Sequence, residues 1–264
     1  MLQHHIDSIE NLKKYYENDE GVIAVILDGS VVKGNARPDS DIDAIVVVTE
    51  GRHEALAKEG RLAEVITGYC TYEGGYFDVK YKTKETLKRA TMSASEPTRN
   101  AYEGAQTVFT KDAEIPDLVA AIGRYPEHER DKKMACFMAN LKLNREYFMS
   151  CVKEDNAYMR AHLAQEVVYS VYRLVLLENR VLFPCNRRLE DTVKKCKTYP
   201  AGLLKLGAKF LKEITAENCE AFVGLFVSTT KLPFNDEINS NLTAYCKYYE
   251  DWWMDENPPF PNEW

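Results

Sequence analysis

Two short motifs near the start of the chain contain residue types that bind phosphate and metal. Gly29 and Ser30 follow one apolar run, and Asp41 and Asp43 stand at the start of the next. Residues two apart in a strand point to the same face, so the two carboxylates are expected side by side, with Ile42 directed into the core. Crowded carboxylates repel each other, and such hard oxygen ligands favour Mg²⁺, which keeps water and phosphate oxygens as further ligands. Backbone N–H groups and the hydroxyl of the Gly-Ser turn suit phosphate oxygens. The motifs therefore predict a nucleotide-phosphate site.

The elements that must position these motifs are two short strands. Residues 22–27 are Val-Ile-Ala-Val-Ile-Leu and residues 44–48 are Ala-Ile-Val-Val-Val, and turn residues bound both runs. Short β-branched runs of this kind are typical of buried strands. An Asp-x-Asp pair also occurs in ordinary Asp-rich hairpins, but the order of strand, Gly-Ser, Asp-Ile-Asp and strand favours a functional site.

This order of residues resembles the signature of the polymerase-β-like nucleotidyltransferase superfamily. The resemblance rests on Gly-Ser at 29–30 and on Ser-Asp-Ile-Asp at 40–43, and it is specific over residues 21–48. The superfamily includes small-molecule adenylyltransferases that modify aminoglycoside and lincosamide antibiotics. It uses a third acidic residue between apolar neighbours on a later strand, and Asp78 in Tyr-Phe-Asp-Val-Lys-Tyr stands in that position. The alternative for Asp78 is a solvent-facing residue of an edge strand.

The resemblance implies roles for these residues. The catalytic and metal-binding residues would be Asp41, Asp43 and Asp78. The nucleotide-binding residues would be Gly29, Ser30 and Ser40. The cofactor would be Mg²⁺, as one ion or a two-ion site, and ATP or another nucleoside triphosphate would be the co-substrate. The acceptor would be a hydroxyl of a small molecule. Asp78 either ligates the metal or takes the acceptor proton, and the resemblance allows both roles.

Composition is that of a soluble globular enzyme. The chain has 264 residues, of which 45% are hydrophobic and 28% charged, enough to bury one large or two smaller cores. No run is long enough to span a membrane, and the polar N-terminus predicts no signal peptide. The cysteines are odd in number, scattered and without a Cys-x-x-Cys pair, so reduced thiols and a cytoplasmic location are expected. They are Cys70, Cys136, Cys151, Cys185, Cys196, Cys219 and Cys246.

The net charge of −7 disfavours a long nucleic acid as partner, because such partners are held by extended basic surfaces. An acidic cleft would instead attract a cationic small molecule. The one basic stretch runs from Lys80 to Arg89 and is interpreted as a solvated surface. The alternative is that Lys80 or Lys82, near Asp78, helps to bind a triphosphate. The sequence does not indicate an oligomeric state.

Alternating strands and helices in the first part of the chain predict an α+β fold, with a small mixed sheet backed by helices. The pattern predicts further strands at 76–81 and 106–110. It predicts helices at 6–18 and 53–68, and another from an N-cap at Thr83 to about Met92. Residues 1–115 are therefore interpreted as the nucleotidyltransferase catalytic domain.

Residues 116–264 are interpreted as an α-helical substrate-binding domain, because helical periodicity dominates after Pro116 and no further strand is evident. Pro184, Pro200 and Pro233 separate the candidate helices. A proline-rich tail covers 257–264. The predicted helices are 127–153, 156–180, 187–197, 201–213, 216–228 and 236–253.

Two segments of this helical part are candidates for the acceptor site. Glu166, Tyr169 and Arg173 share one helix face, where Glu166 is either a general base or, as we favour, the partner of Arg173 in an ion pair. The aromatic and acidic run from Asp251 to Glu256 suits a cationic or sugar ligand. It suits a C-terminal helix that docks on the core equally well, and the sequence favours that structural role.

The favoured function is transfer of a nucleoside monophosphate to a small molecule. Two alternatives stay open. One is a nucleotidyltransferase that modifies protein or RNA, as the antitoxin-type members of the superfamily do. The other is a catalytically silent nucleotide-binding module, against which the presence of all three carboxylates argues.

Overall fold

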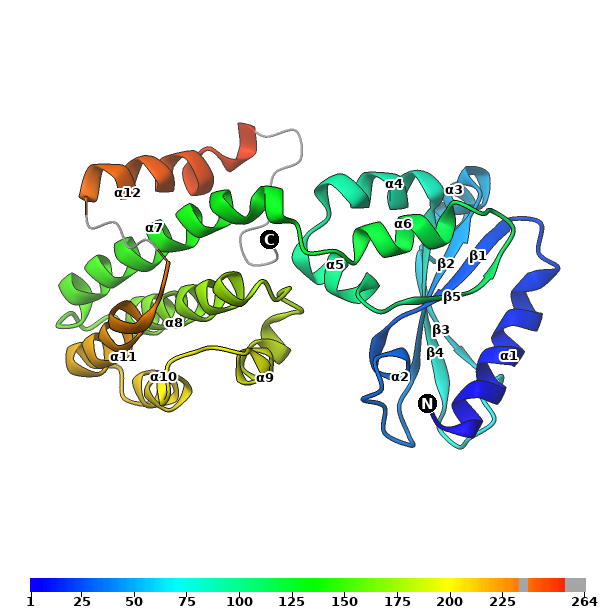
Figure 1. Ribbon diagram of the computed structural model, residues 1–264, viewed down its shortest axis with the longest axis horizontal. Coiled ribbons are helices and arrows are strands. Elements are labelled where there is room, and N and C mark those ends of the chain that lie inside the picture. The colour runs from blue at the N-terminus through cyan, green and yellow to red at the C-terminus, as the bar shows by residue number, and fades with distance from the viewer. Residues whose placement is uncertain (233–236, 255–264) are drawn as a thin grey trace. The chain divides into compact units, whose positions relative to one another are not determined.

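The computed structural model describes residues 1–232 and 237–254. The chain forms two compact units, of which the first spans Met1–Arg124 and the second begins at Tyr125. The predicted fold class is confirmed, with a mixed sheet and its helices in the first unit and helices in the second (Figure 1). The assignment of 1–115 as a catalytic and 116–264 as a substrate-binding domain stays a prediction. Pro233, Glu256 and the tail at 257–264 lie outside the described residues.

The sheet of the first unit has five strands in the order β3-β4-β2-β1-β5. The strands are β1 (Val22–Leu27), β2 (Ile42–Val48), β3 (Ala63–Thr67), β4 (Tyr76–Thr83) and β5 (Gln106–Thr110). The β2 and β4 strands are parallel, and every other neighbouring pair is antiparallel. The four strands predicted from the sequence are therefore confirmed, and β3 is an addition at one edge.

Helices cover both faces of this sheet (Figure 1). They are α1 (Gln3–Glu17), α2 (Gly29–Val32), α3 (Glu50–Lys58), α4 (Lys84–Ser93), α5 (Glu96–Tyr102) and α6 (Ile115–Ile122). On one face, side chains such as Leu27 and Val46 form a core with Leu12 of α1. On the other, side chains such as Ile26 and Ile45 form a second core with α4, α5 and α6. Because β1 and β2 are buried on both faces, their sequences are continuous apolar runs without alternation.

The helix predicted at 53–68 is confirmed up to Lys58 and wrong beyond it. Helix α3 ends at Lys58, and residues 63–67 form β3, which pairs antiparallel with β4. Gly60 adopts the left-handed conformation (φ 69°), and the backbone N–H of Arg61 donates to the carbonyl of Leu56 at 2.8 Å. This is a typical helix C-terminus. Val65 is 62% exposed on this edge strand.

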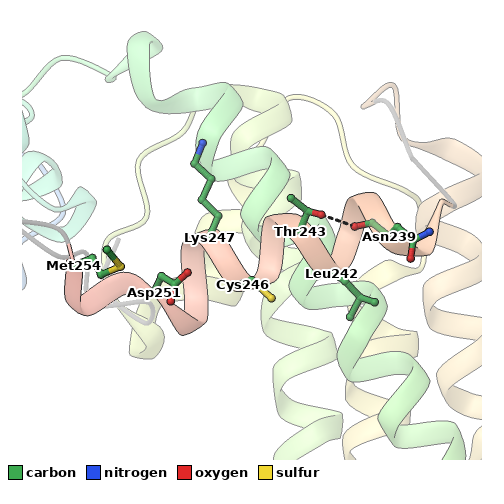
Figure 2. A pocket seen from close by; sticks show the side chains of 7 residues that line it. All are labelled: Asn239, Leu242, Thr243, Cys246, Lys247, Asp251 and Met254. Atoms are coloured by element: carbon green, nitrogen blue, oxygen red, sulfur yellow. Dashed lines mark hydrogen bonds between the residues drawn. The ribbon is translucent and has the colours of Figure 1, made fainter.

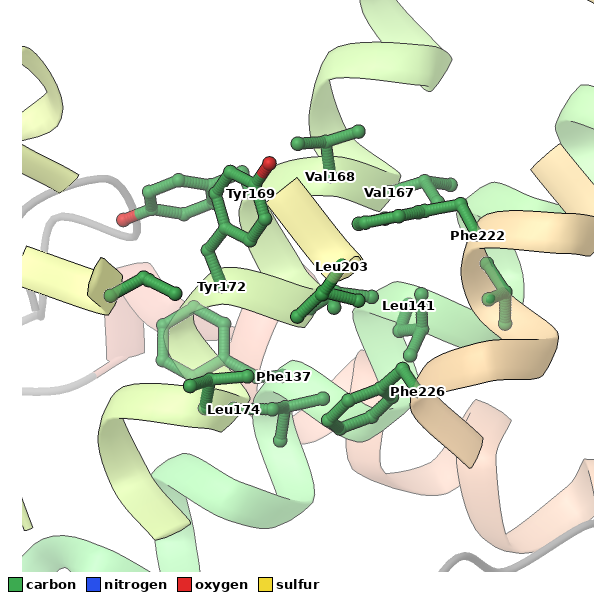
Figure 3. Packing of buried hydrophobic residues seen from close by; sticks show 14 of the residues in the cluster. Phe137, Leu141, Val167, Val168, Tyr169, Tyr172, Leu174, Leu203, Phe222 and Phe226 are labelled. Atoms are coloured by element: carbon green, nitrogen blue, oxygen red, sulfur yellow. The ribbon is translucent and has the colours of Figure 1, made fainter. Parts of the chain in front are cut away.

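The second unit consists of helices in its described part. They are α7 (Glu127–Cys151), α8 (Ala157–Asn179), η1 (Asn186–Arg188), α9 (Leu189–Lys195), α10 (Leu203–Lys212), α11 (Ala216–Thr229), α12 (Ile238–Tyr245), the π-helical turn η2 (Cys246–Glu250) and η3 (Trp252–Met254). These elements lie within the helical segments predicted from the sequence or extend one residue beyond them. Figure 3 shows their core, in which Phe137 and Leu141 of α7 and Leu174 of α8 lie near Phe222 and Phe226 of α11.

Two further observations bear on the sequence predictions. Among residues 1–232 and 237–254, no helix is both long enough and apolar enough to cross a membrane. None of the seven cysteines, all within the described ranges, forms a disulfide.

Candidate functional site

Three carboxylates stand in one row across neighbouring strands of the first unit. Asp43 of β2 lies in register with Asp78 of β4. The backbone N–H of Asp28, directly after β1, donates to the carbonyl of Asp43 at 3.1 Å, so Asp28 lies opposite Asp43 on the other side. Adjacent strands are about 4.8 Å apart, so paired residues present their side chains as close neighbours on one face. We call Asp28, Asp43 and Asp78 the carboxylate row.

The predicted pair is completed by Asp41, two residues before Asp43, while the intervening Ile42 is fully buried. Asp41 also hydrogen-bonds with the hydroxyl of Tyr76 at the start of β4, and its negative charge is the main reason why the pKa of Tyr76 is raised. The structure thus brings Asp41, Asp43 and Asp78 to one end of the sheet. Their roles as metal ligands stay predictions.

Asp28 is a site residue that the sequence analysis missed. It is 7% exposed, and no hydrogen bond from the described part of the chain reaches its carboxylate. Burial, followed by the charge of Asp43, raises its pKa to about 6. The sequence held a signal for it, because side chains alternate between the two faces of a strand, which places Asp28 on the same face as Ala24 and Ile26.

Gly29 lets the chain pass directly beside the Asp43 carboxylate. A Cβ on Gly29 would lie 1.8 Å from Oδ2 of Asp43, and the glycine has a φ of 70°. Only glycine adopts this backbone conformation without strain and leaves room for the carboxylate. Gly29 therefore fixes how closely α2 approaches the carboxylate row.

Ser30, the other residue of the predicted turn, follows Gly29 in the first turn of α2. The backbone N–H groups of such a first turn have no partner within the helix. Both residues therefore stand where phosphate-binding N–H groups were predicted, although contact with a nucleotide stays a prediction.

Ser40 has a different environment from the one that its predicted role suggests. Its hydroxyl accepts a hydrogen bond from the backbone N–H of Arg37 at 2.9 Å, and its carbonyl accepts one from the hydroxyl of Tyr72 at 2.6 Å. Ser40 is 8% exposed. These contacts fix the loop that leads into Asp41, and the nucleotide-binding role of Ser40 stays a prediction.

Charges on neighbouring groups shape the electrostatics of the row. Burial, followed by repulsion from Asp41, raises the pKa of Asp43. Lys80 and Lys33 act in the opposite direction on both Asp43 and Asp28. The amino group of Lys33 donates to the backbone carbonyl of Asn100 on α5, and burial lowers its pKa. The row is thus a crowded, partly desolvated anionic site flanked by two lysines.

The donor set fits a divalent cation, because carboxylate oxygens are the ligands that Mg²⁺ prefers. The buried Asp28 carboxylate and the close approach of Gly29 to Asp43 show a site built around negative charge. In the described ranges, however, no three His, Cys, Asp or Glu side chains are grouped as a ready metal site. Ligation by all three predicted aspartates would therefore require their side chains to move closer together.

In the second unit, the proposed acceptor residues lie in a packed interior. Glu166 accepts a hydrogen bond from Asn140 at 3.2 Å. Arg173 is 1% exposed and lies 4.1 Å from the ring centre of Phe183, with its guanidinium donating to the hydroxyl of Tyr169. The two charged residues therefore contact different groups, rather than forming the predicted ion pair with each other.

The hollow of about 660 Å³ in Figure 2 is lined by α12 and the turns that follow it. Asp251 contributes to this lining together with Lys247 and Met254. Its predicted companion Glu256 lies outside the described residues. An acceptor-binding role for Asp251 stays a prediction.

A family model matches the part of the first unit that carries the carboxylate row. Residues 10–95 match the family model described as polymerase beta, nucleotidyltransferase, so the first unit contains a nucleotidyltransferase domain of the polymerase-β type. This domain supports a nucleotidyltransferase activity. The match spans β1 to β4 and includes the whole carboxylate row. A comparison with curated proteins gives no match.

The solved structures that are similar to the chain include the following two. One is a nucleotidyltransferase-like protein from Exiguobacterium sibiricum 255-15, with 14% identity and a TM-score of 0.49 over 97% of this chain and 82% of that chain. The other is spectinomycin adenyltransferase AAD(9) from Enterococcus faecialis, solved with ATP and spectinomycin. It shares 15% identity, with a TM-score of 0.31, over 90% of this chain and 96% of that chain.

Proposed function

We propose that this protein is a Mg²⁺-dependent nucleotidyltransferase that moves AMP from ATP onto a hydroxyl of a small molecule. An aminoglycoside- or lincosamide-like antibiotic is the proposed class of acceptor. The observation that carries the proposal is the carboxylate row beside Gly29 and Ser30, inside a nucleotidyltransferase domain. Crowded carboxylates next to the backbone N–H groups of a first helical turn form a site for a metal-bound phosphate.

In the proposed reaction, the acceptor oxygen attacks the α-phosphorus of the triphosphate and a new P–O bond forms. The bond between the α-phosphorus and the bridging oxygen breaks, and its electron pair leaves with pyrophosphate. Asp41 and Asp43 would hold Mg²⁺ with Asp78 beside them. The contribution of the metal would be to neutralise the negative charge that develops on the phosphates.

The residues of the chain supply orientation and proton transfer. The first turn of α2 directs the N–H groups of Gly29 and Ser30 at the phosphates. Asp78, whose side chain is 36% exposed, is accessible to an incoming hydroxyl, and we assign it the role of proton acceptor. A positioned base assists because a neutral alcohol is a poor nucleophile.

The test is incubation of the protein with Mg²⁺ and each of the four nucleoside triphosphates, together with a panel of hydroxylated acceptors. We expect pyrophosphate release that depends on one acceptor class, and an acceptor mass increased by one adenylyl group. The matched control is Asp117→Asn, because Asp117 is exposed on α6 of the same unit. This variant should retain the activity that Asp43→Asn loses.

Other outcomes would redirect the proposal. Transfer of label to the protein itself or to RNA would favour the antitoxin-type alternative. Nucleotide binding without any transfer would favour the silent module. Transfer by Asp43→Asn at the wild-type rate would contradict the assignment of the site.

A further inference from the structure

Two lysines of β4 lie on the same face of the strand as Asp78. Lys80 is two residues from Asp78 and Lys82 is four, so both alternate onto the side that carries the carboxylate row. In the sequence they are equivalent candidates for phosphate binding. The structure separates them by their electrostatic surroundings.

Lys80 lies within the field of the row. Its amino group is 3.8 Å from Oδ2 of Asp78, and its side chain is 51% exposed. Among the charges that lower the pKa values of Asp28 and Asp43, that of Lys80 has the largest effect on both. A long, half-exposed ion pair of this kind constrains a lysine little. The amino group is therefore near the carboxylates and able to move to a new partner.

Lys82 lies further along the strand, about 13 Å from the level of Asp78 at a rise of about 3.3 Å per residue. It is in register with Val47, whereas Lys80 is in register with Ile45. Within the described ranges, Lys82 forms no ion pair. It therefore has the same chemistry as Lys80 without the proximity to the row.

The other lysine beside the row is already engaged. The amino group of Lys33 donates both to the backbone carbonyl of Asn100 and, at 3.3 Å, to its side-chain oxygen. A lysine that is held between α2 and α5 in this way positions the start of α2. Lys33 is therefore less able than Lys80 to move its amino group to a ligand.

We propose that Lys80 binds the triphosphate of the nucleotide, leaving its long ion pair with Asp78 for the phosphate oxygens. The inference rests on the proposed function. It identifies Lys80 as the residue that allows the anionic carboxylate row to bind the polyanionic triphosphate. A row of carboxylates repels phosphate unless cations neutralise it, and an ammonium group is a strong phosphate donor. Movement of Lys80 also releases the Asp78 carboxylate for the acceptor.

The experiment compares Lys80→Met with Lys82→Met in the full-length protein. Binding of the non-hydrolysable probe α,β-methylene-ATP and of adenosine is measured calorimetrically with Mg²⁺ present. We expect Lys80→Met to weaken probe binding about tenfold or more, as loss of one charge-assisted contact does. Lys82→Met should stay within about twofold of the wild type, and adenosine binding should not differ among the three proteins. Lys80→Arg should recover most of the affinity.

The outcomes separate this inference from the proposed function. Equal probe affinities for Lys80→Met and Lys82→Met, with a wild type that binds and transfers, would overturn the role of Lys80 alone. A wild type that does not bind the probe would overturn both. Circular dichroism and thermal unfolding check the fold of each variant. If Lys80→Met does not fold, the affinities of Lys80→Arg and Lys80→Gln for α,β-methylene-ATP test the inference instead.

Discussion

The helical core of the second unit and the carboxylate row of the first unit use buried charge in opposite ways. In the second unit, Asn140 donates to Ser170 at 2.8 Å and to Glu166 at 3.2 Å, and Arg173 packs against aromatic rings. Each of these groups has a partner, which is the usual state of a polar group inside a fold. In the carboxylate row, the Asp28 carboxylate is also buried, faces another carboxylate, and receives no hydrogen bond from the described residues. The partnered charges of the helical core therefore indicate a structural role, whereas the crowded carboxylate row indicates a ligand site.

The comparison predicts that removing charge from the carboxylate row abolishes activity without loss of stability. Asp41→Asn and Asp43→Asn should each lower the rate of transfer about 1000-fold, since charge stabilisation at a metal site is worth several kcal/mol. Each should hold or raise the free energy of unfolding, because repulsion with a neighbouring carboxylate is relieved. Transfer assays and urea unfolding on the same preparations measure both effects. A variant that loses stability but transfers at the normal rate would contradict this prediction and indicate a structural role for the aspartate.

In the second unit, a core substitution should instead lower stability and leave nucleotide binding unchanged. Phe226 of α11 is fully buried in the helical core, and Phe226→Ala should lower the free energy of unfolding by about 3–5 kcal/mol through the cavity that it leaves. Phe226→Leu should lose less. Nucleotide affinity, measured by calorimetry on the folded protein, should not change, because no residue of the carboxylate row belongs to this core. Loss of nucleotide binding at full stability would show that the two units are not independent in this respect.

The pH dependence of stability tests the buried carboxylate of the row. The pKa of Asp28 is about 6 in the folded protein against an ordinary 3.8, so the folded state binds more protons than the unfolded state between these values. The free energy of unfolding therefore falls as pH rises through that window. Asp28→Asn removes the penalty and should stabilise the protein by up to about 3 kcal/mol at pH 8, with almost no effect at pH 3.5.

Urea unfolding of Asp28→Asn and wild type at both pH values, with a chelator present, measures this difference. Asp117→Asn on the exposed surface of α6 is the control and should show no such pH dependence. A stabilisation of Asp28→Asn that is equal at both pH values would mean that burial of charge is not its cause.

The sequence predicted the motif strands and the helical segments of the second unit because their apolar periodicity is local. It did not predict the carboxylate row as a row, because the register between β2 and β4, which pairs Asp43 with Asp78, is set by tertiary contacts between segments far apart in the chain. The error at 53–68 had a local cause. The apolar residues there fit a helical period, but Gly60 ends the helix and the following residues pair with β4.

The contacts of Ser40 and Arg173 could not be predicted from the sequence either. A serine beside an Asp-x-Asp motif gives no sign that its hydroxyl and carbonyl are both occupied by loop contacts. An arginine seven residues after a glutamate on a helix gives no sign that it packs against rings contributed by other segments. Tyr72, which bonds the carbonyl of Ser40, and Phe137, which packs on Arg173, belong to other segments, so the residue type alone does not determine the role.

The smallest expected effect concerns the glycines of the loop around α2, which form a matched pair. Gly29 and Gly34 have φ values of 70° and 75°, so alanine is strained at either position by about 1–2 kcal/mol. Only Gly29 faces the row, with a Cβ 1.8 Å from Asp43 Oδ2, whereas a Cβ on Gly34 would meet nothing within 4 Å. Both Gly→Ala variants should therefore lose similar backbone stability, and only Gly29→Ala should displace the Asp43 carboxylate. We expect a fall in Mg²⁺-dependent nucleotide affinity for Gly29→Ala that Gly34→Ala does not share, measured by calorimetry beside urea unfolding of each variant. If both variants lost nucleotide affinity equally, loop strain would be the cause rather than the approach of α2 to the carboxylate row. Gly29 would then be a strained turn residue like Gly34 and not part of a ligand site.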